Sequence, residues 1–233
     1  LIERCQRISS LTQGAFDITY GSVDKKYWNF DTKMTQLPNA KLAKKAVKLV
    51  DYRNIVIDHN NKTVFLKNQG MRIGFGGIGK GYAAEMAKKV MINKGAESGV
   101  VNAAGDLTAW GNQINGRPWT IGIADPNHKR DLFSQFEISN KSVATSGDYE
   151  KYVIIDGKRY SHTIDPVSGM PAQGLKSVTI ICRNTELADA LTTPVIVMGK
   201  DAGLHMINQL DGVEAIIIDE NDEIYYSKNI KIK

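Results

Sequence analysis

The sequence has little of what marks membrane proteins, disulfide-stabilised scaffolds or repeat proteins. No apolar run among its 233 residues approaches the roughly 18 consecutive apolar residues of a membrane-spanning helix. Its two cysteines, Cys5 and Cys182, occupy apolar-periodic positions without metal-binding spacing. We expect two buried thiols there, with a disulfide as the alternative. No repeat and no low-complexity linker divides the chain, so we predict a single domain over residues 1–233.

Charge is also modest and dispersed, with a formal net charge of +5. Lys41, Lys44, Lys45 and Lys48 fall on one side of a predicted helix, opposite an apolar stripe, which is typical of a solvated face. We therefore expect no nucleic-acid partner, although a mild positive balance can attract an anionic small molecule. Hydrophobic residues at 42% and charged residues at 24% are ordinary for a soluble globular protein.

The chain begins at Leu1, without a methionine, inside a segment with the pattern of an amphipathic helix. We expect that further N-terminal sequence precedes it, and that any export signal or lipid anchor lies there.

Helical and strand patterns are mixed without a regular βαβ alternation, which predicts one α+β domain. Helices are expected within residues 1–11, 41–50, 80–95, 185–199 and 202–210. Strands are expected within residues 54–66, 98–111, 119–138, 142–164, 175–182 and 213–227. Residues 14–23 are predicted to run from a loop into a further strand.

A glycine-rich stretch, GMRIGFGGIGKG (residues 70–81), runs into one of these helices. Free backbone amides and the positive end of the helix dipole make such a helix N-terminus suited to anions, and Lys80 adds a charge. The spacing matches neither the Walker pattern nor the dinucleotide fingerprint. We interpret the stretch as a candidate phosphate site, with tight helix–strand packing as the alternative reason for the glycines.

The stretch SHTIDPVSGMP (residues 161–171) places His162 between a predicted strand and a turn. Upstream, YVIIDGKRYSHTI has the pattern of a β-hairpin with Asp156-Gly157 as its two-residue loop. Asp165 and Gly169 suit a tight turn after the histidine. A histidine held beside a turn can act as a general base, whereas the alternative is that it only caps backbone groups.

The stretch NTELADALTTPVIVMG has Thr185 as a plausible N-cap and carries Asp189 and Thr193 one helical turn apart on the same face. Pro194 is expected to bend the helix. A carboxylate and a hydroxyl on an apolar face need partners. Mg²⁺ would satisfy both, because it takes few protein oxygens together with water and substrate phosphates. The alternative is a hydrogen bond of Asp189 to backbone or to Thr193.

Taken in order, the segments GAFDIT, GGIGKGYAAE, NAAGDL, VATSGDYEKY, SHTIDPVSGMP and ADALTTPVIVMG closely resemble the ApbE-like FAD:protein FMN transferases, formerly labelled thiamine-biosynthesis lipoproteins. The most specific pieces are H-x-I-D-P-x-[ST]-G and A-D-A-L-x-T. The resemblance implies an α+β fold with a T-fold-like duplicated architecture of mixed, mostly antiparallel sheets and packed helices. It also implies Mg²⁺-dependent transfer of FMN from FAD to a threonine or serine hydroxyl of an acceptor protein, with release of AMP.

The resemblance assigns roles to individual residues. His162 would take the proton of the acceptor hydroxyl, while Asp189, Thr193 and the backbone carbonyl of Gly79 would hold Mg²⁺. The residues expected around FAD are Ala15, Asp17, Thr19, Lys80, Tyr82, Glu85, Gly105, Asp106, Ser146, His162 and Ile164. These parts suit the reaction, because phosphoryl-type transfer needs positioning and charge neutralisation more than covalent help from the protein.

The chain departs from the family pattern at several positions. The family's DLGGIAKG reads GFGGIGKG here, so that Gly74 replaces an aspartate and Gly79 an alanine. The family's GAFDPTVGPL reads GAFDITYGSV. The family's N-terminal segment, which carries part of the isoalloxazine site, is not in this chain.

Two other functions are compatible with the same motifs: hydrolysis of FAD to FMN and AMP, and flavin binding without catalysis. The family resemblance also implies an exported protein, periplasmic or membrane-anchored, whose only membrane contact is a lipid anchor N-terminal to this chain.

Overall fold

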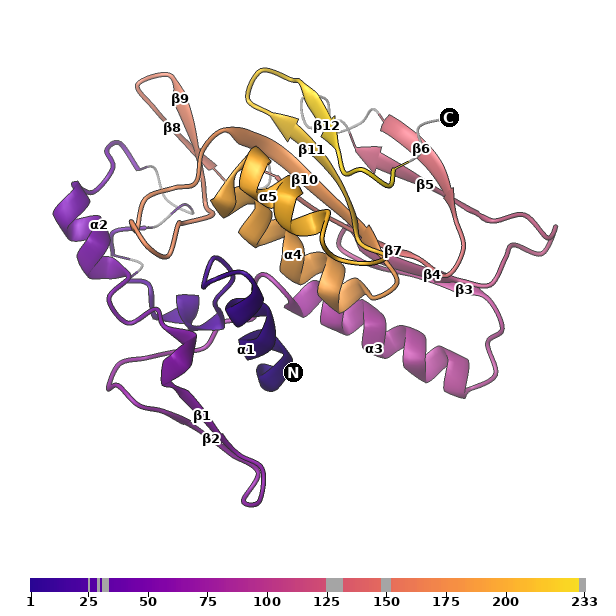
Figure 1. Cartoon of the computed structure of the whole chain (residues 1–233), viewed down its shortest axis with the longest axis horizontal. Helices are drawn as coiled ribbons and strands as arrows, with labels where there is room; N and C mark the ends of the chain where they lie inside the picture. The colour runs from indigo at the N-terminus through magenta and orange to yellow at the C-terminus, as the bar shows by residue number, and fades with distance from the viewer. Residues whose placement is uncertain (25, 29, 31–33, 125–131, 148–151, 231–233) are drawn as a thin grey trace.

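The computed structural model describes residues 1–24, 26–28, 30, 34–124, 132–147 and 152–230. The fold is α+β, as predicted, and the strand pairs within these ranges are antiparallel. A six-stranded sheet with the order β12-β11-β10-β7-β4-β3 forms its centre (Figure 1). Its strands are β3 (Gly99–Ala103), β4 (Asp106–Trp110), β7 (Ser142–Gly147), β10 (Leu175–Cys182), β11 (Glu214–Asp219) and β12 (Ile224–Tyr226).

The middle of this sheet is covered on both faces, which explains why most residues of β10 and β11 are buried. Val178 and Ile180 of β10 pack under helices α4 (Thr185–Met198) and α5 (Lys200–Ile207). Ile181 points the opposite way and packs with the hairpin of β5 (Trp119–Ala124) and β6 (Leu132–Ile138). This alternation follows from the two-residue period of a strand.

Helix α3 (Gly79–Asn93) packs beside α4 and against strands β3 and β4. Gly81 allows this close approach, because a Cβ there would lie 2.3 Å from the carbonyl oxygen of Thr185 and 2.6 Å from Cβ of Asp189. The glycine-rich loop therefore ends at a helix whose first turn touches α4. This contact places the candidate phosphate loop next to the candidate metal ligands.

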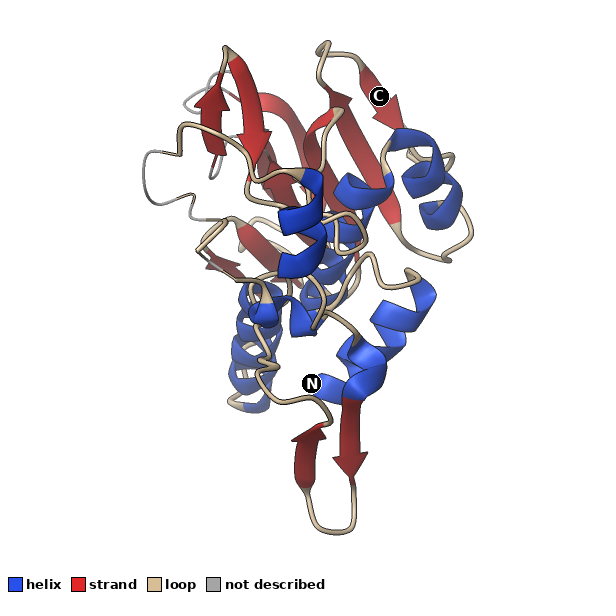
Figure 2. Cartoon of the chain, turned by 90° about the vertical axis from the view of Figure 1, so that its left-hand side faces the viewer, coloured by secondary structure: helices blue, strands red, loops and turns tan. Residues whose placement is uncertain are grey.

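The N-terminal third of the chain lies beside these two helices. It contains α1 (Ile2–Leu11), the 3₁₀ helix η1 (Ile18–Ser22), α2 (Ala40–Ala46), the 3₁₀ helix η2 (Tyr52–Asn54) and the hairpin of β1 (Ile55–Asp58) and β2 (Thr63–Leu66). The β1–β2 hairpin projects away from the rest of the chain (Figures 1 and 2). Phe16 and Ile18 join Ile78 and Ala190 in one apolar cluster, which fixes η1 against α3 and α4.

Most local predictions are confirmed. Asp156 and Gly157 have positive φ values of 51° and 76° in the loop of the hairpin of β8 (Tyr152–Ile155) and β9 (Lys158–Ser161). Cys5 and Cys182 are buried free thiols.

Two local predictions are wrong. Within residues 14–23 the chain forms η1 (Ile18–Ser22) rather than the start of a strand, because the Asp17 side chain accepts a hydrogen bond from the Thr19 amide and starts a helical turn. The N-cap of α4 is Asn184, whose side chain accepts from the Leu187 amide, so Thr185 is the first helical residue.

Helix α4 continues through Pro194 to Met198. No helix in the described part of the chain is long and apolar enough to cross a membrane. The assignment of residues 1–233 to one domain stays a prediction.

Candidate active site

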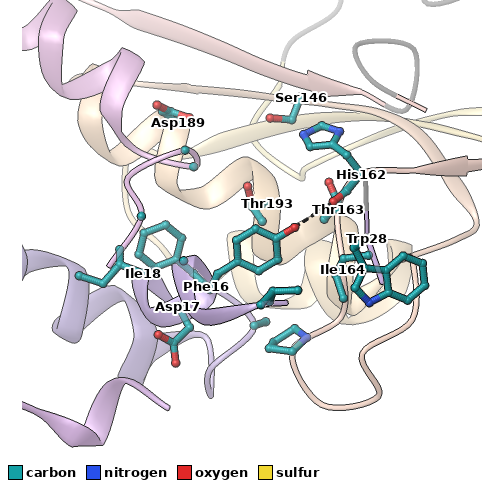
Figure 3. Close-up of a pocket in the computed structure, with 18 of the residues that line it drawn as sticks. Phe16, Asp17, Ile18, Trp28, Ser146, His162, Thr163, Ile164, Asp189 and Thr193 are labelled. Atoms are coloured by element: carbon teal, nitrogen blue, oxygen red, sulfur yellow. Dashed lines mark hydrogen bonds between the residues drawn. The ribbon is translucent and has the colours of Figure 1, made fainter. Parts of the chain in front are cut away.

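A cavity of about 410 Å³ lies where η1, the loop before α3, helix α4 and the loop after β9 meet (Figure 3). Eight of the predicted site residues line it: Ala15, Asp17, Lys80, Ser146, His162, Ile164, Asp189 and Thr193. Six others are absent from its lining: Thr19, Gly79, Tyr82, Glu85, Gly105 and Asp106. The fold thus brings the three separate motifs to one cavity, although they are far apart in sequence.

Two buried carboxylates and one lysine form the charged end of the site. Asp189 and Asp106 are 3% and 1% exposed, and Nζ of Lys80 lies 3.3 Å from Oδ2 of Asp106. Burial, and after it the negative charge of Asp189, raises the pKa of Asp106 to about 7, against the lowering effect of Lys80. When both carboxylates are ionised, one ammonium leaves an excess of negative charge, which favours a bound cation.

Asp189 is fixed from α3, because the backbone amide of Gly81 donates to its Oδ2 at 2.9 Å. Thr193 follows one helical turn later and lines the same cavity. Its Oγ1 lies 3.1 Å from the position that a Cβ on Gly77 would take, so the backbone of Gly77 is in the immediate neighbourhood of Thr193. Gly79, the predicted carbonyl ligand, is the first residue of α3 and lies outside the lining.

The donor set fits a hard divalent cation. A carboxylate, a hydroxyl and backbone carbonyls supply only oxygens, which is the preference of Mg²⁺. Among the described residues, no group of three or more His, Cys, Asp or Glu side chains converges on a metal position. A site with few protein ligands is nevertheless what Mg²⁺ uses when water and substrate phosphates complete its shell.

Ser146, on β7, lines the cavity, and its hydroxyl can accept a hydrogen bond from a bound group because its own hydrogen is already donated within the protein. Its Oγ lies 2.9 Å from Oγ1 of Thr192, and that threonine hydroxyl already donates its hydrogen to the carbonyl oxygen of Asp189 at 2.7 Å. Since a hydroxyl has one hydrogen to donate, Ser146 must be the donor of the pair. Toward a group bound in the cavity, the Ser146 oxygen can therefore act only as a hydrogen-bond acceptor.

His162 follows directly after β9, and its imidazole points toward Ser146 (Figure 3). The turn after it is held by Asp165, whose carboxylate accepts from the amides of Val167 and Ser168. Gly169 has a φ of 75°, and a Cβ there would lie 2.1 Å from the carbonyl oxygen of Ala43 in α2. The predicted turn is confirmed, and its attachment to α2 anchors the loop that carries the histidine.

Asp17 and Thr19 brace the cavity wall. Oδ1 of Asp17 accepts from the amide and the hydroxyl of Thr19, and Oδ2 accepts from the Tyr52 amide at 2.7 Å. Burial raises the pKa of Asp17, while these three hydrogen bonds lower it. In Figure 3 its carboxylate points away from Thr193 and His162. Both side chains thus hold η1 in place from behind the cavity.

Three other predicted residues lie outside the cavity. Glu85, 6% exposed, accepts from the amide of Thr185 at the start of α4. Tyr82 is half-buried on α3. Gly105 has a φ of 101° in the turn between β3 and β4, where its amide donates to Asn102. The part of VATSGDYEKY from Asp148 to Lys151 lies outside the described residues.

Part of the cavity wall is aromatic and was missed by the sequence analysis. Phe16, Tyr20, Trp28 and Phe30 all line it. Trp28 and Phe30 are stacked, with ring centroids 6.0 Å apart and an interplanar angle of 7°. The only local signal was the density of aromatic residues between positions 27 and 30. A planar aromatic ligand group would suit this wall.

Comparisons with known proteins agree with this geometry. The model of the ApbE family matches residues 1–217. The FAD:protein FMN transferase of Klebsiella pneumoniae is 29% identical over 235 residues, covering 100% of this chain and 72% of its own length. The enzyme of the same name from Haemophilus influenzae is 27% identical over 230 residues, covering 96% and 66%.

Two solved structures are similar throughout. The ApbE protein from Thermotoga maritima superposes with a TM-score of 0.87 at 35% identity, covering 97% of this chain and 74% of its own. The flavinyl transferase ApbE of Pseudomonas stutzeri superposes with a TM-score of 0.83 at 29% identity, covering 97% and 71%. With the family model matching nearly the whole chain, this chain belongs to the ApbE family.

Proposed function

We propose that this chain is an FAD:protein FMN transferase, which moves FMN from FAD to a threonine or serine hydroxyl of an acceptor protein and releases AMP. The observation that carries the proposal is the meeting of His162, the Asp189–Thr193 pair and the glycine-rich loop in one cavity. The names of similar proteins, FAD:protein FMN transferases, support the same activity.

Asp189, Thr193 and a backbone carbonyl of the glycine-rich loop would hold Mg²⁺. Gly77 is a better candidate for that carbonyl than Gly79, because it lines the cavity beside Thr193. When bound, Mg²⁺ neutralises phosphate charge and stabilises the leaving phosphate of AMP. When Asp106 and Asp189 are both ionised, their negative charge exceeds the positive charge of Lys80, which supports a cation at this end of the cavity.

The rest of the diphosphate would lie over the first turn of α3. This helix has 15 residues, and its N-terminal amides and dipole favour negative charge. Lys80 is held near that position by Asp106 and lines the cavity. The flavin ring would lie at the aromatic wall, where Trp28 and Phe30 offer flat apolar faces.

His162 would accept the proton of the acceptor hydroxyl as that oxygen attacks the phosphorus of the FMN half. A bond forms between the acceptor oxygen and this phosphorus, the bond from the phosphorus to the oxygen of the AMP phosphate breaks, and AMP leaves with that oxygen. Ser146 presents an acceptor to the same region, so it can orient an N–H or O–H group beside His162. No covalent bond to this chain is needed.

The test is incubation of the protein with FAD, Mg²⁺ and an acceptor protein that bears a threonine. Flavin fluorescence that stays with the denatured acceptor, together with AMP in equal amount, is the expected result. AMP and FMN without a labelled acceptor would identify a hydrolase instead. Tight FAD binding with neither product would leave a flavin-binding protein, and the transferase proposal would fail.

A further inference from the structure

Tyr20 connects the wall of the cavity to the backbone that carries His162. Its hydroxyl donates to the carbonyl oxygen of His162 at 3.2 Å, across 142 positions of sequence (Figure 3). Tyr20 itself lines the cavity and keeps 40% of its surface exposed. The bond therefore links η1 with the loop after β9 directly at the site.

The segment that carries Tyr20 is rigidly held. Asp17 fixes its start through the Tyr52 amide, and the Gly74 amide donates to the carbonyl oxygen of Ile18 at 2.8 Å. Gly21 follows Tyr20 and packs backbone to backbone, since a Cβ there would lie 2.7 Å from the carbonyl carbon of Ile73. A tyrosine on such a segment can act as a fixed support for the opposite loop.

The His162 carbonyl, which accepts this hydrogen bond, lies just beyond the end of the β8–β9 strand pair. The ladder between β8 and β9 stops at Ser161, whose Oγ accepts from the Thr163 amide, and the Thr163 carbonyl accepts from the Ala172 amide at 2.8 Å. The carbonyl of His162 lies between these fixed points. A hydrogen bond to it fixes the plane of the following peptide and hence ψ of His162. The direction of the imidazole relative to the loop depends on that angle.

Two departures from the family pattern meet here. Where that pattern, GAFDPTVGPL, has a valine, this chain has Tyr20, and a valine has no hydrogen-bond donor on its side chain. Where the pattern DLGGIAKG has an aspartate, this chain has Gly74, and a Cβ at Gly74 would lie 3.3 Å from Cα of Gly21. Gly74 thus leaves room for the close approach of the segment that carries Tyr20.

We propose that Tyr20 is a positioning residue that orients His162 for the reaction through the His162 carbonyl. The proposal rests on the proposed function and adds to it a residue that positions the base. Although 40% of the Tyr20 surface is exposed, the protein around its hydroxyl raises the pKa of Tyr20 to about 12. Even an ordinary phenol, with a pKa of about 10, keeps its hydrogen at neutral pH, so Tyr20 remains a donor.

The test compares the wild type with Tyr20→Phe, which removes only the oxygen, and with Tyr20→Val. The matched control is Tyr225→Phe on β12, which removes a phenol oxygen hydrogen-bonded to Asp219 away from the cavity. For Tyr20→Phe, kcat of flavin transfer should fall roughly three- to tenfold, as the loss of one hydrogen bond predicts, while KM for FAD stays within about twofold. Tyr20→Val should lose at least as much, and the control should match the wild type.

A second readout is independent of activity. In NMR spectra of the free protein, the Hε1–Cε1 signal of the His162 ring and the amide signal of Thr163 should both move in Tyr20→Phe and stay in place in Tyr225→Phe. Unchanged signals, an unchanged kcat, or a rise in KM for FAD without a change in kcat would each overturn the proposal. If the wild type shows no transfer at all, the proposed function fails, and the NMR comparison still decides whether Tyr20 orients His162.

Discussion

Replacing Gly81 by alanine tests the contact that joins the glycine-rich loop to α4. A Cβ at Gly81 would lie 2.3 Å from the Thr185 carbonyl oxygen, whereas unstrained contacts lie at about 3.5 to 4 Å. Helices α3 and α4 would therefore have to separate by about 1 Å at this point. The same movement would stretch the 2.9 Å hydrogen bond from the Gly81 amide to Asp189.

The magnitude follows from these terms. Overpacking costs about 1–3 kcal/mol, and loss of a hydrogen bond to a charged group about 1.5–3 kcal/mol. The better helix propensity of alanine offsets about 1 kcal/mol. We expect Gly81→Ala to lower the free energy of unfolding by about 1.5–5 kcal/mol. It should also raise the Mg²⁺ concentration needed for half-maximal activity, because Asp189 moves.

Gly79 supplies the control in the same helix. A Cβ on Gly79 would meet Cβ of Phe75 at 3.6 Å, an ordinary contact. Gly79→Ala should therefore leave stability unchanged or raise it by up to about 1 kcal/mol. Urea unfolding with both variants gives the comparison, provided that the slope m is the same. A Gly81→Ala protein within about 0.5 kcal/mol of the wild type would refute the argument that this contact is tight.

Two further predictions concern charged groups. Glu186 is 4% exposed and accepts both Arg4 hydrogen bonds, at 2.6 and 2.9 Å, so Glu186→Gln should lower the free energy of urea unfolding by about 1–3 kcal/mol. The exposed pair of Glu3 and Arg7 is the control, and Glu3→Gln should change the free energy of unfolding by less than about 0.5 kcal/mol. Equal effects of Glu186→Gln and Glu3→Gln would contradict this reasoning. Because the pKa of Asp106 rises from 3.8 to about 7 on folding, the folded state binds its proton more tightly, and the stability of the metal-free protein should fall as pH rises through that window. Asp106→Asn should flatten this part of the pH profile of the melting temperature, and an unchanged slope would contradict the assignment.

Local signals in the sequence predicted local features well. Asp156-Gly157 predicted its hairpin because a two-residue loop of type I′ needs positive φ at both positions, and the structure has them. That Lys80, His162 and Asp189 lie at one cavity was predicted only through the family resemblance. A local sequence pattern does not show how close α3, the loop after β9 and α4 lie in the folded chain. Each motif alone was compatible with a purely structural role.

Other features depend on distant partners and could not be derived. The carboxylate of Asp17 is used by the Tyr52 amide, 35 positions away, so its position behind the cavity follows from tertiary packing. The same holds for the bond from Tyr20 to His162, which joins residues 142 positions apart. Thr185 lost the N-cap position to Asn184 because two good capping residues are adjacent, and composition alone does not choose between them.

The arrangement also separates positioning from chemistry. Thr19 and Glu85 are buried, and each accepts a backbone hydrogen bond: from the Asp51 amide to Thr19, and from the Thr185 amide to Glu85. They hold η1 and α4, while His162, Asp189 and Thr193 face the cavity. Substituting Thr19 or Glu85 should mainly lower stability. Substituting His162, Asp189 or Thr193 should mainly lower activity.

The most direct test of the account is the His162→Ala variant, with His205→Ala on the exposed side of α5 as the control. The dissociation constant for FAD is measured for each protein. Each protein is then mixed with FAD, Mg²⁺ and the acceptor protein, and the mass of the acceptor is measured by mass spectrometry. We predict that His162→Ala binds FAD within a few-fold of the wild type yet adds no FMN to the acceptor, whereas His205→Ala labels it normally. Labelling of the acceptor by His162→Ala at the wild-type rate would contradict the role of His162 as the base.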